Sequence, residues 1–464
     1  MEPALWRIGV TCVKLARSAR VVVQWHTERP LPFDPWLYHW HSRRILRLRC
    51  TEGERNMRFL KQVFAVQGEK ARVSRRDFLG GAAGAAGVSV LAQMIPGRAH
   101  AGPPLPGSAG PFNDDPVTLD WIFSRWDELG VWGDTVGTLV EINEAKRKDA
   151  LKLGQRGDAK VYSLGEPMRA GNPAFPHDPP RRADYWIAAY GPVGENEFFY
   201  QDERFEAFTF QQATQVDDFG HPSFGGWFYG GHRFEQITPR PEILDPLERQ
   251  ALARADSEAA NYGPNSILGG TASLGIQNIG PIVTRGLLLD VLGYKLAAGH
   301  TSAVTPDGKS LAPGYRITIA DLQATMDWEG LGCIEPGDVV IIRTGWSHYW
   351  TDEALWPTYL GAAPGPWIAE CHWLAQFRPA IVASDTYAME VFPGPRATAL
   401  AEGHQVLMVA NGIRIGEGFN SAALAADGVY EFMFFDTPYN LAGATCAGNA
   451  PAAIGGPRKK KKKP

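Results

Sequence analysis

Two short apolar runs constrain the fold more than any other feature of the sequence. Val339 to Ile342 follows a Gly-Asp turn, and Ala380 to Ala383 follows a helical pattern over residues 367–376. Apolar runs without alternation are typical of strands buried on both faces, as in parallel sheets covered by helices. Because helical and strand patterns alternate through residues 119–455, we expect an α/β fold in a single large domain.

The remaining elements expected in this domain follow from periodicity and from turn residues. We expect strands at 160–164, 205–216 and 430–435, a strand running into a short helix at 283–292, and helices within 119–152, at 317–326 and from 424. The Pro-rich stretch 167–182 excludes regular structure there.

Charge is distributed unevenly along the chain. The first 101 residues hold 17 basic and 7 acidic side chains, and the remaining residues hold 29 basic and 43 acidic ones. Phosphate contacts require Lys and Arg, so an acidic main domain argues against a nucleic-acid partner. A small-molecule substrate is the expected partner. The basic residues that end the chain, within 456–464, are expected to form a solvated tail.

The basic N-terminal region contains an export signal. Ser74 to Leu79 has the twin-arginine pattern, a Gly/Ala-rich apolar stretch follows to about Ile95, and Ala99-His100-Ala101 supplies an A-x-A cleavage site. We therefore expect a signal peptide at 57–101, a periplasmic or secreted mature protein beginning near Gly102, and no stable membrane span in that mature chain. The signal lies far from Met1, so residues 1–56 are interpreted as an over-extended N-terminus upstream of a true start at Met57. A Pro- and Gly-rich linker at 102–118 would precede the domain.

The densest polar cluster of the domain lies between Gln211 and His221. It is similar to the motif H-x-G-T-H-x-D-x-P-x-H of the cyclase family, which includes bacterial kynurenine formamidase (an arylformamidase) and isatin hydrolase. Asp217 and His221 stand in register with the motif, whereas two family histidines are replaced by Gln211 and Gln215. The chain has Thr-Gln-x-Asp where the family motif has Thr-His-x-Asp. In this it resembles a subfamily of longer proteins that carry the same change.

Further blocks resemble the family in the same order along the chain. They are Gly137-Thr138-Leu139, Tyr229-Gly230-Gly231, Arg285 to Asp290, Pro336 to Trp346, Ser384-Asp385-Thr386, His404, Glu417 and Gly443-Ala444-Thr445. The resemblance runs from near Trp121 to Ile454. It implies the swivelling β/β/α architecture and a homodimer or larger homo-oligomer.

The resemblance also implies a metal site. Asp217, His404 and Glu417 occupy the remaining family ligand positions, and Gln211 or Gln215 would contact the metal or the substrate. One imidazole and two carboxylates suit Zn²⁺ or Mn²⁺ with open positions for water. Two histidine-to-glutamine changes should weaken the site, favour a harder metal, or abolish it.

Other side chains have both a functional and a structural interpretation. His221 matches the family's acid/base histidine, and the alternative is a structural histidine beside Pro222. Phe219, Trp227 and Tyr229 would line a substrate pocket or fill the core. The strand-terminal Arg343 and Asp385 would bind substrate or, for Arg343, form a structural ion pair.

These features favour an exported, metal-dependent hydrolase that cleaves an amide or lactam C–N bond through an activated water and His221. One alternative is a polyketide-type cyclase or dehydratase, or a lactone hydrolase, on the same scaffold. The other is a non-catalytic small-molecule binding protein that has lost its metal together with the two histidines.

Overall fold

The computed structural model describes residues 112–173, 181, 183–237 and 270–457, together with two N-terminal strands. Residues 1–95 and 96–464 form separate compact units. In the first unit, β1 (Arg7–Leu15) and β2 (Ser18–His26) pair as an antiparallel hairpin. The predicted signal peptide and nearly all of the predicted basic tail lie outside the described residues.

The second unit is built on a nine-stranded sheet with the order β14-β6-β12-β11-β10-β9-β13-β15-β3. The strands are β3 (Lys160–Ser163), β6 (Gln215–Asp217), β9 (Ile282–Asp290), β10 (Val339–Arg343), β11 (Ile381–Ser384), β12 (Arg414–Glu417), β13 (Glu431–Asp436), β14 (Cys446–Gly448) and β15 (Ala452–Gly455). The central strands β9, β10, β11 and β12 run parallel, and antiparallel strands extend the sheet on both sides.

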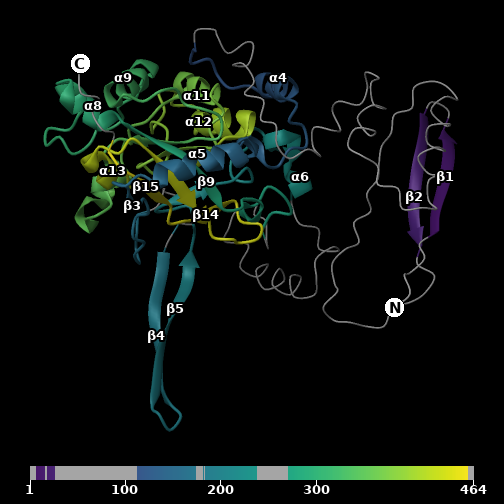
Figure 1. The fold of residues 1–464 in the computed structure, drawn as a ribbon, viewed down its shortest axis with the longest axis horizontal. Helices are drawn as coiled ribbons and strands as arrows, with labels where there is room; N and C mark the ends of the chain where they lie inside the picture. The colour runs from purple at the N-terminus through teal and green to yellow at the C-terminus, as the bar shows by residue number, and fades with distance from the viewer. Residues whose placement is uncertain are drawn as a thin grey trace. The chain divides into compact units, whose positions relative to one another are not determined.

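Helices pack against this sheet (Figure 1). They are α4 (Leu119–Leu129), α5 (Glu144–Gly154), α6 (Phe234–Ile237), α8 (Val291–Ala297), α9 (Ile319–Glu329), α10 (Trp356–Tyr359), α11 (Ile368–Ala375), α12 (Glu402–His404), the π-helical turn η9 (Gln405–Ala410) and α13 (Ala422–Asp427). Short 3-10 turns are η1 (Gly137–Glu141), η2 (Tyr229–Gly231), η5 (Ile276–Asn278), η6 (Thr301–Ala303), η7 (Trp346–Tyr349) and η8 (Glu353–Leu355). A capping box fixes the start of α9, because Thr318 accepts from the Asp321 backbone N–H and Asp321 accepts in return.

The central strands are apolar without alternation because both of their faces are buried. On β9, Leu287 and Leu289 belong to a core formed with α4, α9, α11 and η9, whereas Leu288 belongs to a second core that contains Phe432 and Phe434 of β13. Each of these leucines is at most 1% exposed. The α/β class and the single large domain are thus as expected from the sequence.

One predicted strand is divided in two. The pattern at 205–216 indicates a continuous strand, but β5 (Phe198–Phe208) ends at Phe208, residues 209–214 are irregular, and β6 begins at Gln215. The first half pairs with β4 (Ala183–Val193) in a hairpin that extends away from the sheet (Figure 1), and the second half joins the main sheet. A smaller hairpin of β7 (Trp227–Phe228) and β8 (His232–Arg233) follows. None of the helices within the described residues has the length and apolar character needed to span a bilayer.

A buried carboxyl at the end of β13 makes stability depend on pH. Burial raises the pKa of Asp436 to about 7, and Asn449 Nδ2 donates to Asp436 Oδ2 at 2.6 Å. The folded state holds this proton more tightly than the unfolded state, so its contribution to stability is complete below about pH 4 and is lost as pH rises to about 7. Asp436→Asn should therefore unfold at higher urea concentration than the parent protein, and its advantage should be larger at pH 8 than at pH 5 by about 2 kcal/mol. The exposed Asp149→Asn should show no such gain, and an equal effect of Asp436→Asn at both pH values would contradict the assignment.

Candidate active site

The short strand β6 brings the polar cluster into the sheet between two partners. Asp217 lies opposite Ile415 of β12 and opposite Cys446 of β14, and Gln215 lies opposite Glu417. Asp217 is fully buried and Gln215 is 1% exposed. Strand pairing therefore places the motif beside Glu417, which is 200 residues away in the sequence.

A buried ion pair shapes the turn that follows β6. Arg414 of β12 lies 2.7 Å from the Asp218 carboxylate and sits over the Phe219 ring, and all three side chains are at most 1% exposed. The backbone N–H of His221 donates to Asp218 O at 2.9 Å. The turn therefore carries the His221 ring back towards Asp217.

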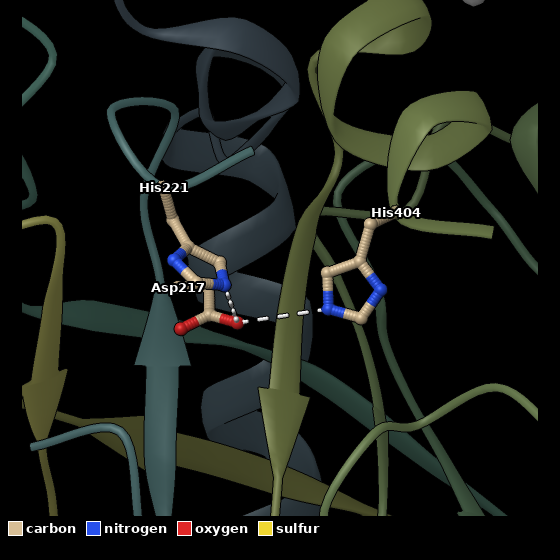
Figure 2. Close-up of side chains that lie close together, drawn as sticks. All are labelled: Asp217, His221 and His404. Atoms are coloured by element: carbon tan, nitrogen blue, oxygen red, sulfur yellow. Dashed lines mark ion pairs between the residues drawn. The ribbon is translucent and has the colours of Figure 1, made fainter. Parts of the chain in front are cut away.

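Asp217 lies between two imidazole rings (Figure 2). Its Oδ2 is 3.9 Å from Nε2 of His221 and 3.9 Å from Nε2 of His404, the last residue of α12. The same His404 Nε2 is 3.5 Å from Glu417 Oε1. The structure thus brings together the four residues that the sequence singles out for metal binding and proton transfer.

The two glutamines join this cluster through their side-chain amides. Gln215 Nε2 donates to Glu417 Oε2 at 2.8 Å and to Gln211 Oε1 at 3.0 Å, and lies 3.4 Å from Asp217 Oδ1. Gln211 Nε2 in turn lies 3.2 Å from His221 Nδ1. An uninterrupted chain of hydrogen bonds therefore runs from Glu417 to His221.

Burial shifts the protonation of the cluster. It raises the pKa of Asp217 to about 6, and burial together with the Asp217 carboxylate raises the pKa of Glu417 to about 7. For His221, burial and then the neighbouring His404 lower the pKa far below its ordinary value, so the ring is neutral at pH 7. Burial alone would lower the pKa of His404, but its hydrogen bonds to Glu390 and Glu417 raise it instead.

This cluster fits a divalent metal. Asp217, His221 and His404 each offer one ligand atom within 4.8 Å of the others. Asp217 Oδ2 is buried and forms no hydrogen bond, and a buried carboxylate oxygen without a donor calls for a cation or water. His404 Nε2 lies 3.9 Å from Asp217 Oδ2 and 3.5 Å from Glu417 Oε1. These three side chains supply one imidazole and two carboxylates, a donor set found in zinc and manganese sites.

A cavity of about 460 Å³ opens beside His221. Gln211 and His221 belong to its lining, Phe210, Phe228 and Phe234 contribute aromatic side chains, and Cys446 also lines it. None of the described lining residues is Asp, Glu, Lys or Arg. We call this space the His221 cavity.

The other predicted substrate residues lie elsewhere. Phe219 and Tyr229 pack against each other in the core with tilted rings whose centroids are 4.5 Å apart, and the Trp227 ring lies under Arg233. Arg343 forms an ion pair with Asp290 at 2.6 Å. Asp385 accepts hydrogen bonds from the Thr344 backbone, the Thr344 hydroxyl and the Gly345 backbone, which fix the turn after β10. The described lining of the His221 cavity includes none of these five side chains, and their role in substrate binding stays a prediction.

Glu390 was missed by the sequence reasoning. Its Oε1 accepts from His404 Nδ1 at 2.5 Å and from the His404 backbone at 3.0 Å, and its Oε2 accepts from the Gly403 backbone at 2.8 Å. A Cβ at position 403 would lie 3.0 Å from the Glu390 carboxyl, so a larger residue there would force this carboxyl to shift by a few tenths of an ångström. The available signal was a single acidic residue within the apolar stretch Ala388 to Phe392.

Glu390 fixes the His404 ring so that Nε2 faces Asp217 and Glu417. Carboxylates that hold the second nitrogen of a metal-binding histidine orient the ring and raise its basicity. Glu390→Gln should therefore weaken Zn²⁺ affinity by about 10- to 100-fold, measured by calorimetry. Glu370→Gln removes a carboxylate that is equally buried but is bound to Arg316 and should change affinity by less than about twofold. Equal affinities in the parent protein and Glu390→Gln would contradict the role.

Comparison with known proteins places the chain in a family. Residues 162–391 match a family model described as "Putative cyclase". Through this segment the chain belongs to the cyclase family. Asp217, His221 and Glu390 lie inside the matched segment, whereas His404 and Glu417 lie beyond it.

One solved structure supports the cyclase-family fold, and two others are reported as similar. A crystal structure of a novel cyclase is 24% identical with a TM-score of 0.53, over 71% of this chain and 96% of that chain. Isatin hydrolase A from Ralstonia solanacearum is 15% identical with a TM-score of 0.42, over 66% of this chain and 97% of that chain. A predicted metal-dependent hydrolase from Bacillus stearothermophilus is 15% identical with a TM-score of 0.34, over 64% of this chain and 98% of that chain. No curated protein sequence matches the chain.

Proposed function

We propose that this cyclase-family protein is a metal-dependent hydrolase that cleaves a carbon–nitrogen bond of an uncharged amide or lactam. The observation that carries the proposal is the position of Asp217 Oδ2, which is buried without a hydrogen bond between the rings of His221 and His404. Asp217, His404 and Glu417 would hold the metal. A bound Zn²⁺ or Mn²⁺ would polarise the substrate carbonyl and lower the pKa of a water molecule.

The chain's own residues supply the proton transfers. His221 is neutral at pH 7 and faces both Asp217 and the cavity, so it is able to accept a proton from the attacking water and pass it to the leaving nitrogen. Acceptance at Nε2 requires the tautomer that carries its proton on Nδ1. Glu390 holds His404 in place throughout.

The lining of the His221 cavity supports an uncharged substrate. A carboxylate or ammonium group that enters it would gain no ionic partner among the described lining residues. The volume of about 460 Å³ lies within the range for small-molecule sites, and the aromatic walls suit a ring.

A matched pair of substrates tests this proposal. Formanilide and 2-formamidobenzoate share a formylated aromatic amine and differ by one carboxylate. The Zn²⁺- or Mn²⁺-loaded full-length protein should release aniline from formanilide with a kcat/KM at least about tenfold above that for the anionic compound, since an unpaired buried charge costs more than 1.4 kcal/mol. Absence of hydrolysis of these compounds and of a bicyclic lactam by the metal-loaded protein would contradict the hydrolase assignment. It would then favour a binding protein, in which the Gln215 amide replaces the metal by bonding to Glu417.

We also propose export by the twin-arginine route, on the basis of residues 74–101. N-terminal sequencing of the protein recovered from the native periplasm should begin near Gly102. A native protein that retains residues upstream of Ser74 would contradict this proposal.

A further inference from the structure

The glutamines that replace two family histidines connect the metal site to the acid/base histidine. Gln215 contacts the Glu417 and Asp217 carboxylates at one end, and Gln211 contacts the His221 ring at the other. The two amides are joined by one hydrogen bond of 3.0 Å. We call these two side chains the amide relay.

The observed directions of these bonds fix one tautomer of His221. The Gln215 NH₂ group faces the two carboxylates, so Gln211 Oε1 is an acceptor and the Gln211 NH₂ group faces His221 Nδ1. A ring nitrogen that accepts a hydrogen bond carries no proton, so the proton of the neutral ring resides on Nε2. In this state Nε2 has no free electron pair with which to accept a proton from water.

If Asp217 and Glu417 held a divalent cation, the preferred direction of the Gln215 amide would reverse. An NH₂ group beside a divalent cation would be repelled, whereas an amide oxygen in the same place would be an additional ligand. Turning the Gln215 amide by half a revolution would direct its oxygen towards the carboxylates and Gln211. Gln211 must then turn as well, which directs Gln211 Oε1 towards His221 Nδ1 and requires a proton on Nδ1. The electron pair of Nε2 is then free.

The cost of this reversal is small. The two ends of an amide side chain have nearly the same size, so the turn requires little space. Gln215 Oε1 is buried without a hydrogen bond in the observed state, so the turn exchanges one unpartnered amide atom for another. The contact between Gln211 and Gln215 is kept with donor and acceptor exchanged. The hydrogen bond from Gln211 that lowers the pKa of Asp217 is lost, and a metal bound to that carboxylate would replace it.

We propose that the amide relay makes the tautomer of His221 depend on the metal, so that His221 becomes a base only when the metal is bound. Gln211 and Gln215 are therefore positioning residues, and this role rests on the proposed function. The relay provides a physical reason for glutamine at both positions, because glutamine carries a donor and an acceptor on one rotatable group.

Nitrogen NMR of the histidine rings tests the relay. In full-length protein labelled with ¹⁵N-histidine at pH 8, the His221 signals (assigned by their loss in His221→Asn) should show the Nε2–H tautomer without metal and the Nδ1–H tautomer with Zn²⁺. His232 bonds to Asp134 O outside the relay and should show no change. Gln211→Leu should bind Zn²⁺ within about threefold of the parent protein, yet its His221 tautomer should not respond to the metal.

Metal analysis of the same samples separates the outcomes. Uptake of Zn²⁺ with unchanged His221 signals would overturn the relay and leave the hydrolase proposal intact. A metal-dependent tautomer that persists in Gln211→Leu would also overturn the relay. Absence of Zn²⁺ uptake by the parent protein would overturn both proposals.

Discussion

Replacing Asp217 with asparagine should remove the metal and nearly all hydrolytic activity. Asparagine has the same shape, but it is a neutral and weaker ligand at the position that contacts both histidine rings. Loss of the metal removes several kcal/mol of transition-state stabilisation, so kcat/KM should fall at least about 1000-fold. Bound metal, measured by plasma mass spectrometry after dialysis, should fall from about one equivalent to below about a tenth.

Asp436→Asn is a suitable control for this variant. Asp436 is also buried and also lies at a strand end, but its hydrogen-bond partner is Asn449 and not a residue of the site. This control should retain the metal and the parent kcat/KM. Full metal occupancy in Asp217→Asn would contradict the ligand assignment.

His221→Asn should lower activity without removing the metal. The metal ligands remain, so metal content should stay near that of the parent protein. Removal of a general acid/base group should lower kcat by about 10²- to 10⁴-fold. Steady-state kinetics on formanilide, together with metal analysis, measures both quantities.

His232→Asn is the control for His221. His232 is a nearby histidine whose Nε2 contacts Asp134 O, away from the cluster. Its replacement should change kcat by less than about twofold. A kcat for His221→Asn within threefold of the parent value would show that proton transfer does not pass through this ring.

The central strands were predictable because of their composition. β10 and β11 are apolar on both faces, and such runs have few other stable solutions in a domain of this size. β12 was not predicted because Arg414 and Glu417 interrupt its apolar pattern. Both charged residues are nevertheless buried, since Arg414 pairs with Asp218 and Glu417 lies in the site.

The site could be predicted only in part, for a related reason. Asp217 and His221 are four residues apart, so a local motif brings them together. His404 and Glu417 come from distant elements, and only the family resemblance indicated them. Glu390 acts through a contact with His404 that forms after the chain has folded, and no spacing in the sequence records that contact. Likewise, which end of each glutamine amide acts as the hydrogen-bond donor depends on tertiary contacts.

Anomalous X-ray diffraction from a Zn²⁺-loaded crystal tests whether Asp217, His404 and Glu417 hold the metal. We expect one strong peak at about 2.0–2.2 Å from Asp217 Oδ2, His404 Nε2 and a Glu417 carboxylate oxygen, with His221 outside the coordination sphere. A map without a peak at this position, with the Gln215 amide still bonded to Glu417, would contradict it.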